Sequence, residues 1–170
     1  MNNYQENRIG RPQLFFLVIL RMVIGWHFLY EGISKLMNVN WSSHSYLMDS
    51  QGFAADVFYW MAGHPVILKC VDFINIWGLI AIGIGLICGF LTQTATWSAI
   101  ILLTFYYLSH PALITAKYAV PSEGSYLIIN KIIIEIAALL VLLVFRTGHI
   151  IGIDRLLGNY YCRRNKKLSE

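Results

Sequence analysis

The chain has 170 residues, of which 57% are hydrophobic and only 13% are charged, and its formal net charge at pH 7 is +4. Soluble domains carry about 25% charged residues, so the composition excludes an ordinary soluble protein and indicates a membrane protein. Most positive charges stand near the two ends of the chain and form no central basic patch, which argues against a nucleic-acid partner.

Four apolar windows are long enough to cross a bilayer, which requires roughly 17–25 residues in a helix. They cover residues 13–37, 66–90, 92–109 and 126–146 and take up most of the chain. No room remains for a separate soluble domain. The sequence therefore predicts one all-α membrane domain over residues 1–170, an antiparallel bundle of four transmembrane helices.

The first window carries ionisable residues on one side of the predicted helix. Five residues follow one another at spacings of four and three and share a stripe: Arg21, Gly25, Phe28, Gly32 and Lys35. His27 and Glu31 lie beside this stripe, and Glu31 precedes Lys35 by four residues, which favours an ion pair. Charges inside a membrane rarely face lipid, so we expect this side to face the interior of the bundle.

The segment after the first window contains no Lys or Arg between residues 38 and 65 and is rich in aromatic residues. Residues 45–61 are predicted to form one or two amphipathic helices that lie along the outer interface or cap the open end of the bundle. Either arrangement places a lid over the outer mouth.

The later windows add further polar residues. The second carries Asp72 and Asn75 on neighbouring positions, and its Gly78, Gly85 and Gly89 share a narrow sector that favours close helix packing. The fourth window carries a polar group at its start: Asn130, Lys131 and Glu135. We expect Arg21 to pair with Glu135 deep in the bundle. Glu31 and Asp72 are expected to share Lys35 and Lys131 nearer the outer face.

These residues define the candidate site. Glu31, Asp72 and Glu135 are the candidate catalytic groups, as a proton relay. The candidate ligand-binding residues are Arg21, His27, Lys35, Asn75, Asn130 and Lys131. The structural alternative is that the buried ion pairs only fix the register of the helices.

Metal and cofactor motifs are absent from the sequence. His44, His64 and His110 match no metal-ligand spacing, so no metal site is predicted. No haem, phosphate-loop or dinucleotide motif is present, so no cofactor is evident from the motifs. The basic residues near both termini predict that the N and C termini are cytoplasmic, with a basic tail over residues 147–170.

The same polar and glycine positions resemble the DoxX-like family of four-helix membrane proteins. The motif Arg21-x-x-x-Gly25-x-x-Phe28-x-x-x-Gly32-x-x-Lys35 resembles the family's opening signature. Residues 77–83, Leu86-x-x-Gly89 and Asn130 followed by Glu135 continue the resemblance. It implies a multi-pass protein of the bacterial inner membrane, and some relatives are subunits of thiosulfate:quinone oxidoreductases.

Three functions stay open at this point. The favoured interpretation is an accessory or assembly subunit that binds a membrane-protein partner, a lipid or a second copy of itself. The first alternative is a quinone-linked oxidoreductase subunit that oxidises a small sulfur compound or thiol. The second is a small-anion carrier. The sequence leaves open whether the protein is an enzyme.

Overall fold

The computed structural model describes residues 10–112, 118, 128–145 and 147–155. Its elements are all helical, in agreement with the predicted all-α class. In chain order they are α2 (Arg11–Met37), α3 (His44–Met48), α4 (Ala55–Gly63), α5 (Pro65–Cys88), α6 (Thr92–Ser109), α7 (Lys131–Val144) and the short 3-10 helix η1 (Thr147–His149).

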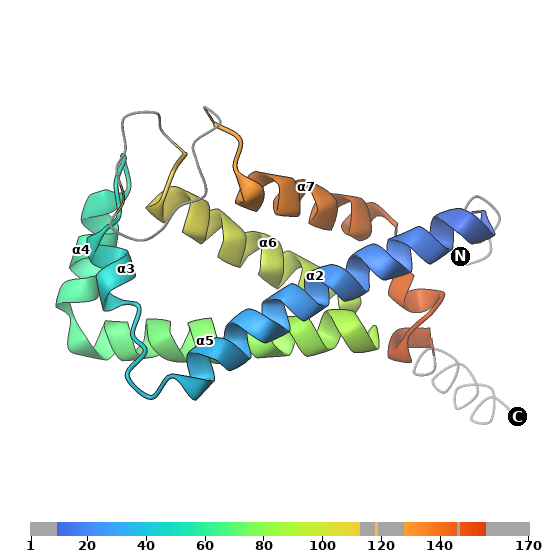
Figure 1. The fold of residues 1–170 in the computed structure, drawn as a ribbon, viewed down its shortest axis with the longest axis horizontal. Coiled ribbons are helices and arrows are strands. Elements are labelled where there is room, and N and C mark those ends of the chain that lie inside the picture. Colours follow the sequence, from blue (N-terminus) through green and yellow to red (C-terminus); the bar gives the residue numbers. More distant parts are fainter. Residues whose placement is uncertain (1–9, 113–117, 119–127, 146, 156–170) are drawn as a thin grey trace, which may run out of the picture.

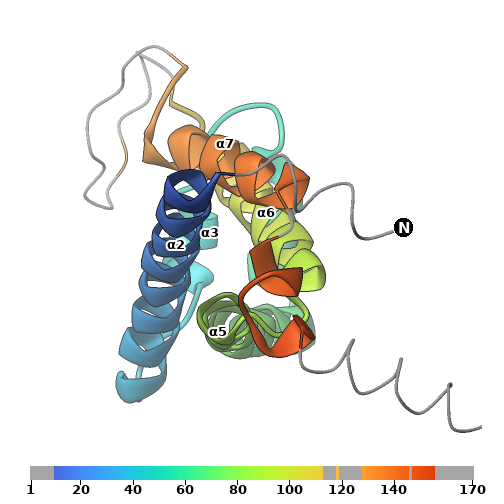
Figure 2. The same ribbon diagram turned by 90° about the vertical axis from the view of Figure 1, so that its right-hand side faces the viewer.

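The four long helices form a ring in which each contacts its neighbours. α2 packs along α5, α5 packs on α6, α6 on α7, and α7 returns to α2. Figure 1 shows α3 and α4 together at one end of this arrangement, and the segment after α7 at the other. Figure 2 looks nearly along α5, which lies at the bottom of the view, with α2 to its left and α6 and α7 above it. We call the α3–α4 end the cap end and the opposite end the η1 end.

Among the described residues, two helices are long and apolar enough to cross a membrane, α2 with 27 residues and α5 with 24. Their bounds agree with the first two predicted windows to within two residues, and α6 has the predicted bounds. α7 is shorter than predicted, with 14 residues, because it begins at Lys131 after Asn130 caps its first turn. Residues 126, 127 and 146 of that window lie outside the described residues.

The predicted stripe of α2 is confirmed, but it faces α5 and not a polar interior. Arg21, Gly25, Phe28 and Gly32 are buried. A Cβ on Gly25 would lie 3.1 Å from the Gly83 carbonyl oxygen, and one on Gly32 would lie 2.9 Å from the Ile80 backbone nitrogen. Small residues thus let the backbones of α2 and α5 approach closely. Arg21 and Lys35 lie at the two ends of this contact.

Close helix packing was predicted at Gly78, Gly85 and Gly89 of α5, and this prediction is wrong for Gly78. A Cβ on Gly78 would meet nothing closer than 4.0 Å, whereas one on Gly83 would lie 2.6 Å from the Leu29 backbone nitrogen. Gly83 is five residues beyond Gly78, so it lies on a different side of the helix. The close approach to α2 therefore depends on Gly83.

The apolar core lies between the four long helices. All four long helices contribute its most buried members, which are Phe28, Leu79, Leu86, Ala99 and Leu139. A second, smaller cluster of Leu47, Phe58 and Ala62 joins α3 and α4 at the cap end. The prediction of one or two helices in this segment is confirmed, and the cluster packs on Leu68 and Leu108. The segment therefore covers the end of the bundle.

Candidate functional site

Lys35 occupies the centre of a polar network near the cap end. Its Nζ donates to Asn75 Oδ1 at 2.9 Å and to the Tyr106 hydroxyl at 3.3 Å. Tyr106 in turn donates to the same Asn75 oxygen at 2.8 Å. Glu31, one turn before Lys35 on α2, brings a carboxylate oxygen to 4.0 Å from Nζ. The Lys35 amine therefore joins the last turn of α2 to the last turn of α6 and to the first half of α5.

Aromatic rings cover this amine. Nζ lies 5.2 Å from the centroid of the Trp41 ring and 5.4 Å from that of Tyr106, distances at which a cation is attracted to the ring face. The Lys35 side chain is 17% exposed and that of Glu31 is 47% exposed. We call Glu31, Lys35, Asn75 and Tyr106 the lysine network.

A second group joins the lysine network to α3. The Tyr46 ring stacks on His110 with centroids 3.9 Å apart and meets Tyr106 edge to face. His110 Nε2 lies 3.7 Å from Asp49 Oδ2, and Tyr118 covers the other part of the ring. Burial lowers the pKa of His110, and the Asp49 carboxylate opposes this effect only in part. The imidazole is therefore neutral at pH 7.

Asp72 does not join the lysine network, contrary to the expectation that Glu31 and Asp72 share Lys35 and Lys131. Its carboxylate accepts hydrogen bonds from the Ser42 hydroxyl at 3.0 Å and from the Ser43 backbone N–H at 2.8 Å, and it also bonds the Ser43 hydroxyl. The serines stand between α2 and α3, so Asp72 fastens this connection to α5. The Glu31–Lys35 part of the expected pairing is found.

The predicted pair of Arg21 and Glu135 is wrong. Glu135 Oε2 lies 3.9 Å from His27 Nε2. Arg21 is six residues before His27, which places it about 9 Å along the helix and on another side. Arg21 therefore faces α5 and η1, whereas His27 faces α7.

His27 and Glu135 belong to a line of polar residues at the junction of α2 and α7. It consists of His27, Glu31, Lys131 and Glu135, and we call it the polar strip. The His27 side chain is 51% exposed and that of Glu135 is 16% exposed, and Lys131 is exposed on the turn before Glu135. Glu31 and Lys131 are both close enough to act electrostatically on Glu135. Charged groups therefore reach the outer surface of an otherwise apolar pair of helices.

Asn130 has a structural position. Its side-chain oxygen accepts the backbone N–H of Ile133 at 3.1 Å and caps the first turn of α7. Such a cap typically stabilises a helix by about 1 kcal/mol. This contact accounts for Asn130 without a ligand.

Arg21 lies at the η1 end, far from the lysine network. Its Nη1 donates to the Thr147 hydroxyl at 3.3 Å, and Asp154 acts on it electrostatically. Asp154 itself accepts the backbone N–H groups of Leu91 and Thr92, at 2.7 and 3.0 Å, and the Thr92 hydroxyl at 2.6 Å. A residue from the end of the chain thus caps the N-terminus of α6.

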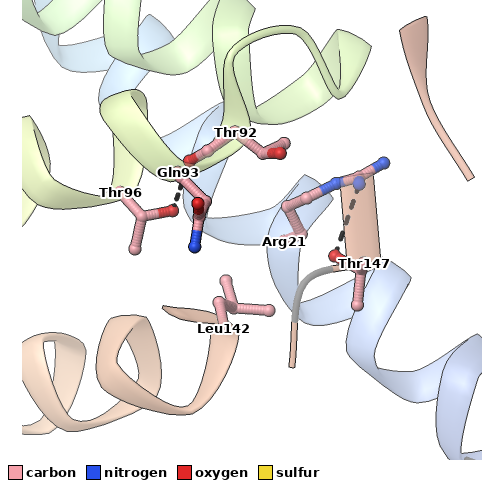
Figure 3. Close-up of a pocket in the computed structure, with 6 residues that line it drawn as sticks. All are labelled: Arg21, Thr92, Gln93, Thr96, Leu142 and Thr147. Carbon is pink, nitrogen blue, oxygen red and sulfur yellow. Dashed lines mark hydrogen bonds between the residues drawn. The ribbon is translucent and has the colours of Figure 1, made fainter. Parts of the chain in front are cut away.

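A small pocket lies beside Arg21 at this end (Figure 3). Its lining residues come from α2, α6, α7 and η1: Arg21, Thr92, Gln93, Thr96, Leu142 and Thr147. Of the predicted site residues, only Arg21 lines it. The described residues contain no group of three or more His, Cys, Asp or Glu that could hold a metal ion.

Sequence reasoning missed several residues of these sites. Tyr106 and Trp41 look like ordinary interfacial aromatic residues in the sequence, yet both contact the Lys35 amine. Thr147 and Asp154 follow the last apolar window, in a segment predicted only as a basic tail. Asp154 and Glu170 are the two acidic residues of this basic tail, and an acidic residue in such a segment is the signal that could have pointed to Asp154.

Comparison with known proteins gives one match. The model of the DoxX family matches residues 16–112, which is more than half of the chain. The matched region runs from residue 16, within α2, past the end of α6, and therefore includes the whole lysine network. No curated protein and no solved structure matches the chain.

Proposed function

The chain belongs to the DoxX family of membrane proteins, and from this premise we propose that it is an accessory subunit that binds another membrane protein through the polar strip. In this proposal α2, α5, α6 and α7 all cross the membrane as an antiparallel bundle. The membrane is the bacterial inner membrane, with both termini in the cytoplasm, because the Lys and Arg residues gather near the termini. The cap end then faces outward.

The exposure of the polar strip carries this proposal. His27 is half-exposed near the middle of α2, and Glu31 is nearly as exposed one turn later. Around them α2 presents exposed Val23, Trp26 and Tyr30, as expected for a lipid-facing surface. Ionisable groups in contact with hydrocarbon cost several kcal/mol, so a surface of this kind is stable when a polar partner covers it.

Site-specific photo-cross-linking tests the proposal. A photoreactive residue at position 27 should give one adduct of defined mass in native membranes, and the variant Lys131→Gln should reduce its yield. The matched control is position 101 on α6, where Ile101 is also exposed and the helix contains no Asp, Glu, Lys, Arg or His. Equal labelling at both positions, or labelling of lipid alone, would contradict a partner at the polar strip.

A quinone-linked role is the second candidate, and the lysine network favours it. The Lys35 amine and the Tyr106 hydroxyl both bond the Asn75 oxygen, and a half-exposed carboxylate, Glu31, stands beside them. Two donors could hold a quinone oxygen, and a carboxylate could exchange a proton with it on reduction. A partner would have to bring the redox centre that supplies electrons.

Binding of a quinone analogue to the purified protein tests this candidate. Lys35→Gln and Tyr106→Phe should each weaken binding about tenfold, whereas Tyr107→Phe should leave it unchanged, since the Tyr107 hydroxyl bonds the Ile128 carbonyl elsewhere. Binding that is equal in all three variants would remove quinone from consideration. It would leave the accessory role untouched.

A further inference from the structure

The buried guanidinium of Arg21 is short of hydrogen-bond acceptors. The residue is 3% exposed, and within the described residues its side chain donates one hydrogen bond, to Thr147. Its Nε is buried and has no hydrogen-bond partner among these residues. A buried donor that has no acceptor costs free energy, and a charged one costs more. Some additional acceptor near Arg21 would therefore stabilise the folded protein.

Asp154 balances the charge of Arg21 only from a distance. Its carboxylate oxygens receive the N–H groups of Leu91 and Thr92 and the Thr92 hydroxyl. Part of its negative charge is thus directed to the positive end of the α6 dipole. The region around Arg21 keeps hydrogen-bond donors in excess.

The pocket beside Arg21 collects more donors. The Thr147 hydroxyl accepts from Arg21 and so has its own proton to donate. The Gln93 amide, which has no hydrogen bond within the described part of the chain, extends from α6 towards Leu142 of α7 (Figure 3). The six lining residues include no carboxylate. Donors from α2, α6 and η1 therefore meet around one small space that has an apolar wall at Leu142.

The size of the pocket limits what it could hold. The space is about as large as one water molecule requires. A sulfate or phosphate ion, with four oxygens around its central atom, is too large. A single spherical ion only slightly larger than water fits with small shifts of the side chains.

We propose that this pocket is a binding site for a small spherical monoanion of the halide type, with chloride as the ion of matching size. Arg21 supplies the positive charge, Thr147 and Gln93 supply neutral donors, and Leu142 closes the remaining side. The ion links α2, α6, α7 and η1 at the end of the bundle opposite the lysine network. This site is independent of the polar strip and of quinone binding.

Thermal unfolding of the purified full-length protein at constant ionic strength tests the site. Replacing gluconate by chloride should raise Tm by about 2–4 °C in a saturable manner, and bromide should act similarly, whereas sulfate should not. The effect should disappear in Arg21→Gln and remain in Arg11→Gln. Arg11 is the matched control because it is an exposed arginine on the same helix.

A second variant covers the case in which Arg21→Gln does not fold. Gln93→Leu removes only the amide donor of the pocket, so it should weaken the chloride response several-fold and leave Tm in gluconate nearly unchanged. Equilibrium dialysis with labelled chloride should give about one bound ion per chain in the unaltered protein. A Tm that is equal in chloride and gluconate, or an equal response in Arg21→Gln, would overturn the proposal and assign the pocket to a water molecule.

Discussion

Gly83 of α5 lies directly against the backbone of Leu29 of α2. A Cβ at position 83 would stand 2.6 Å from the Leu29 nitrogen and 2.8 Å from the Gly25 carbonyl oxygen. Both of these atoms belong to the α2 backbone, so no side-chain rotation can relieve such a contact. The separation of the two longest helices is therefore set by the absence of one methyl group.

Gly83→Ala should destabilise the protein because α2 would have to move away from α5. Overpacking of this kind typically costs about 1–3 kcal/mol, and thermal unfolding in detergent should show a clearly lower Tm. Gly78→Ala is the control on the same helix, since its Cβ would meet only Ile74, at 4.0 Å. Similar losses in the two variants would contradict the α2–α5 arrangement.

Tyr106→Phe should destabilise the lysine network. It removes the donor to Asn75 Oδ1 and one acceptor of the Lys35 amine, and a lost buried hydrogen bond costs about 1–2 kcal/mol. Tyr107→Phe removes a bond at an exposed position and should cost less. Measured unfolding free energies that rank the two variants in the opposite order would argue against a network centred on Lys35.

Asp154→Ala should loosen the first turn of α6. The carboxylate satisfies two backbone N–H groups and one hydroxyl there, and loss of a helix N-cap typically costs about 0.5–2 kcal/mol. Hydrogen exchange at Leu91 and Thr92 should become faster, while exchange in α7 should not change. Asp154→Asn retains an acceptor and should have an intermediate effect.

His110 should make stability depend on pH. Burial lowers its pKa below the ordinary value of 6.5, so the unfolded chain binds a proton more readily than the folded one. Stability from this group is therefore complete above about pH 6.5 and is lost as the pH falls towards the folded pKa. The measured free energy of unfolding should therefore decrease as the pH is lowered from 7 to 5.

The variant His110→Phe separates this effect from other titrations. It gives up the bond to Ser109 and should be less stable at pH 7, yet its stability should change less between pH 7 and pH 5. His44→Phe alters an exposed histidine on α3 and should keep the full dependence. An unchanged slope in His110→Phe would show that another group is responsible.

The helices could be predicted from the sequence because apolar windows are a local signal. The stripe on α2 was also predictable, since helical spacing alone brings Arg21, Gly25 and Lys35 to one side. Which side faces which helix is not local. The same spacing fits a polar interior or a packing seam, and only the rotation of α2 against α5 decides between them.

The partners of the charged residues show the same limit. Opposite charges at similar depth suggested that Arg21 meets Glu135, whereas the rotation of α2 directs Arg21 towards Thr147 and His27 towards Glu135. Asp72 accepts hydrogen bonds from the hydroxyl and backbone groups of the loop between α2 and α3. A count of charges could not have indicated these partners. The pair of Glu31 and Lys35 was predictable because it lies within one helix.

The position of Asp154 has a consequence for biosynthesis. The hairpin of α5 and α6 is synthesised before residue 154, so the first turn of α6 lacks this cap until residue 154 has been made. Completion of that turn is therefore coupled to the arrival of the segment that follows α7. A nascent chain that ends before residue 154 would contain α5, α6 and α7 but would lack the contact of Asp154 with the start of α6.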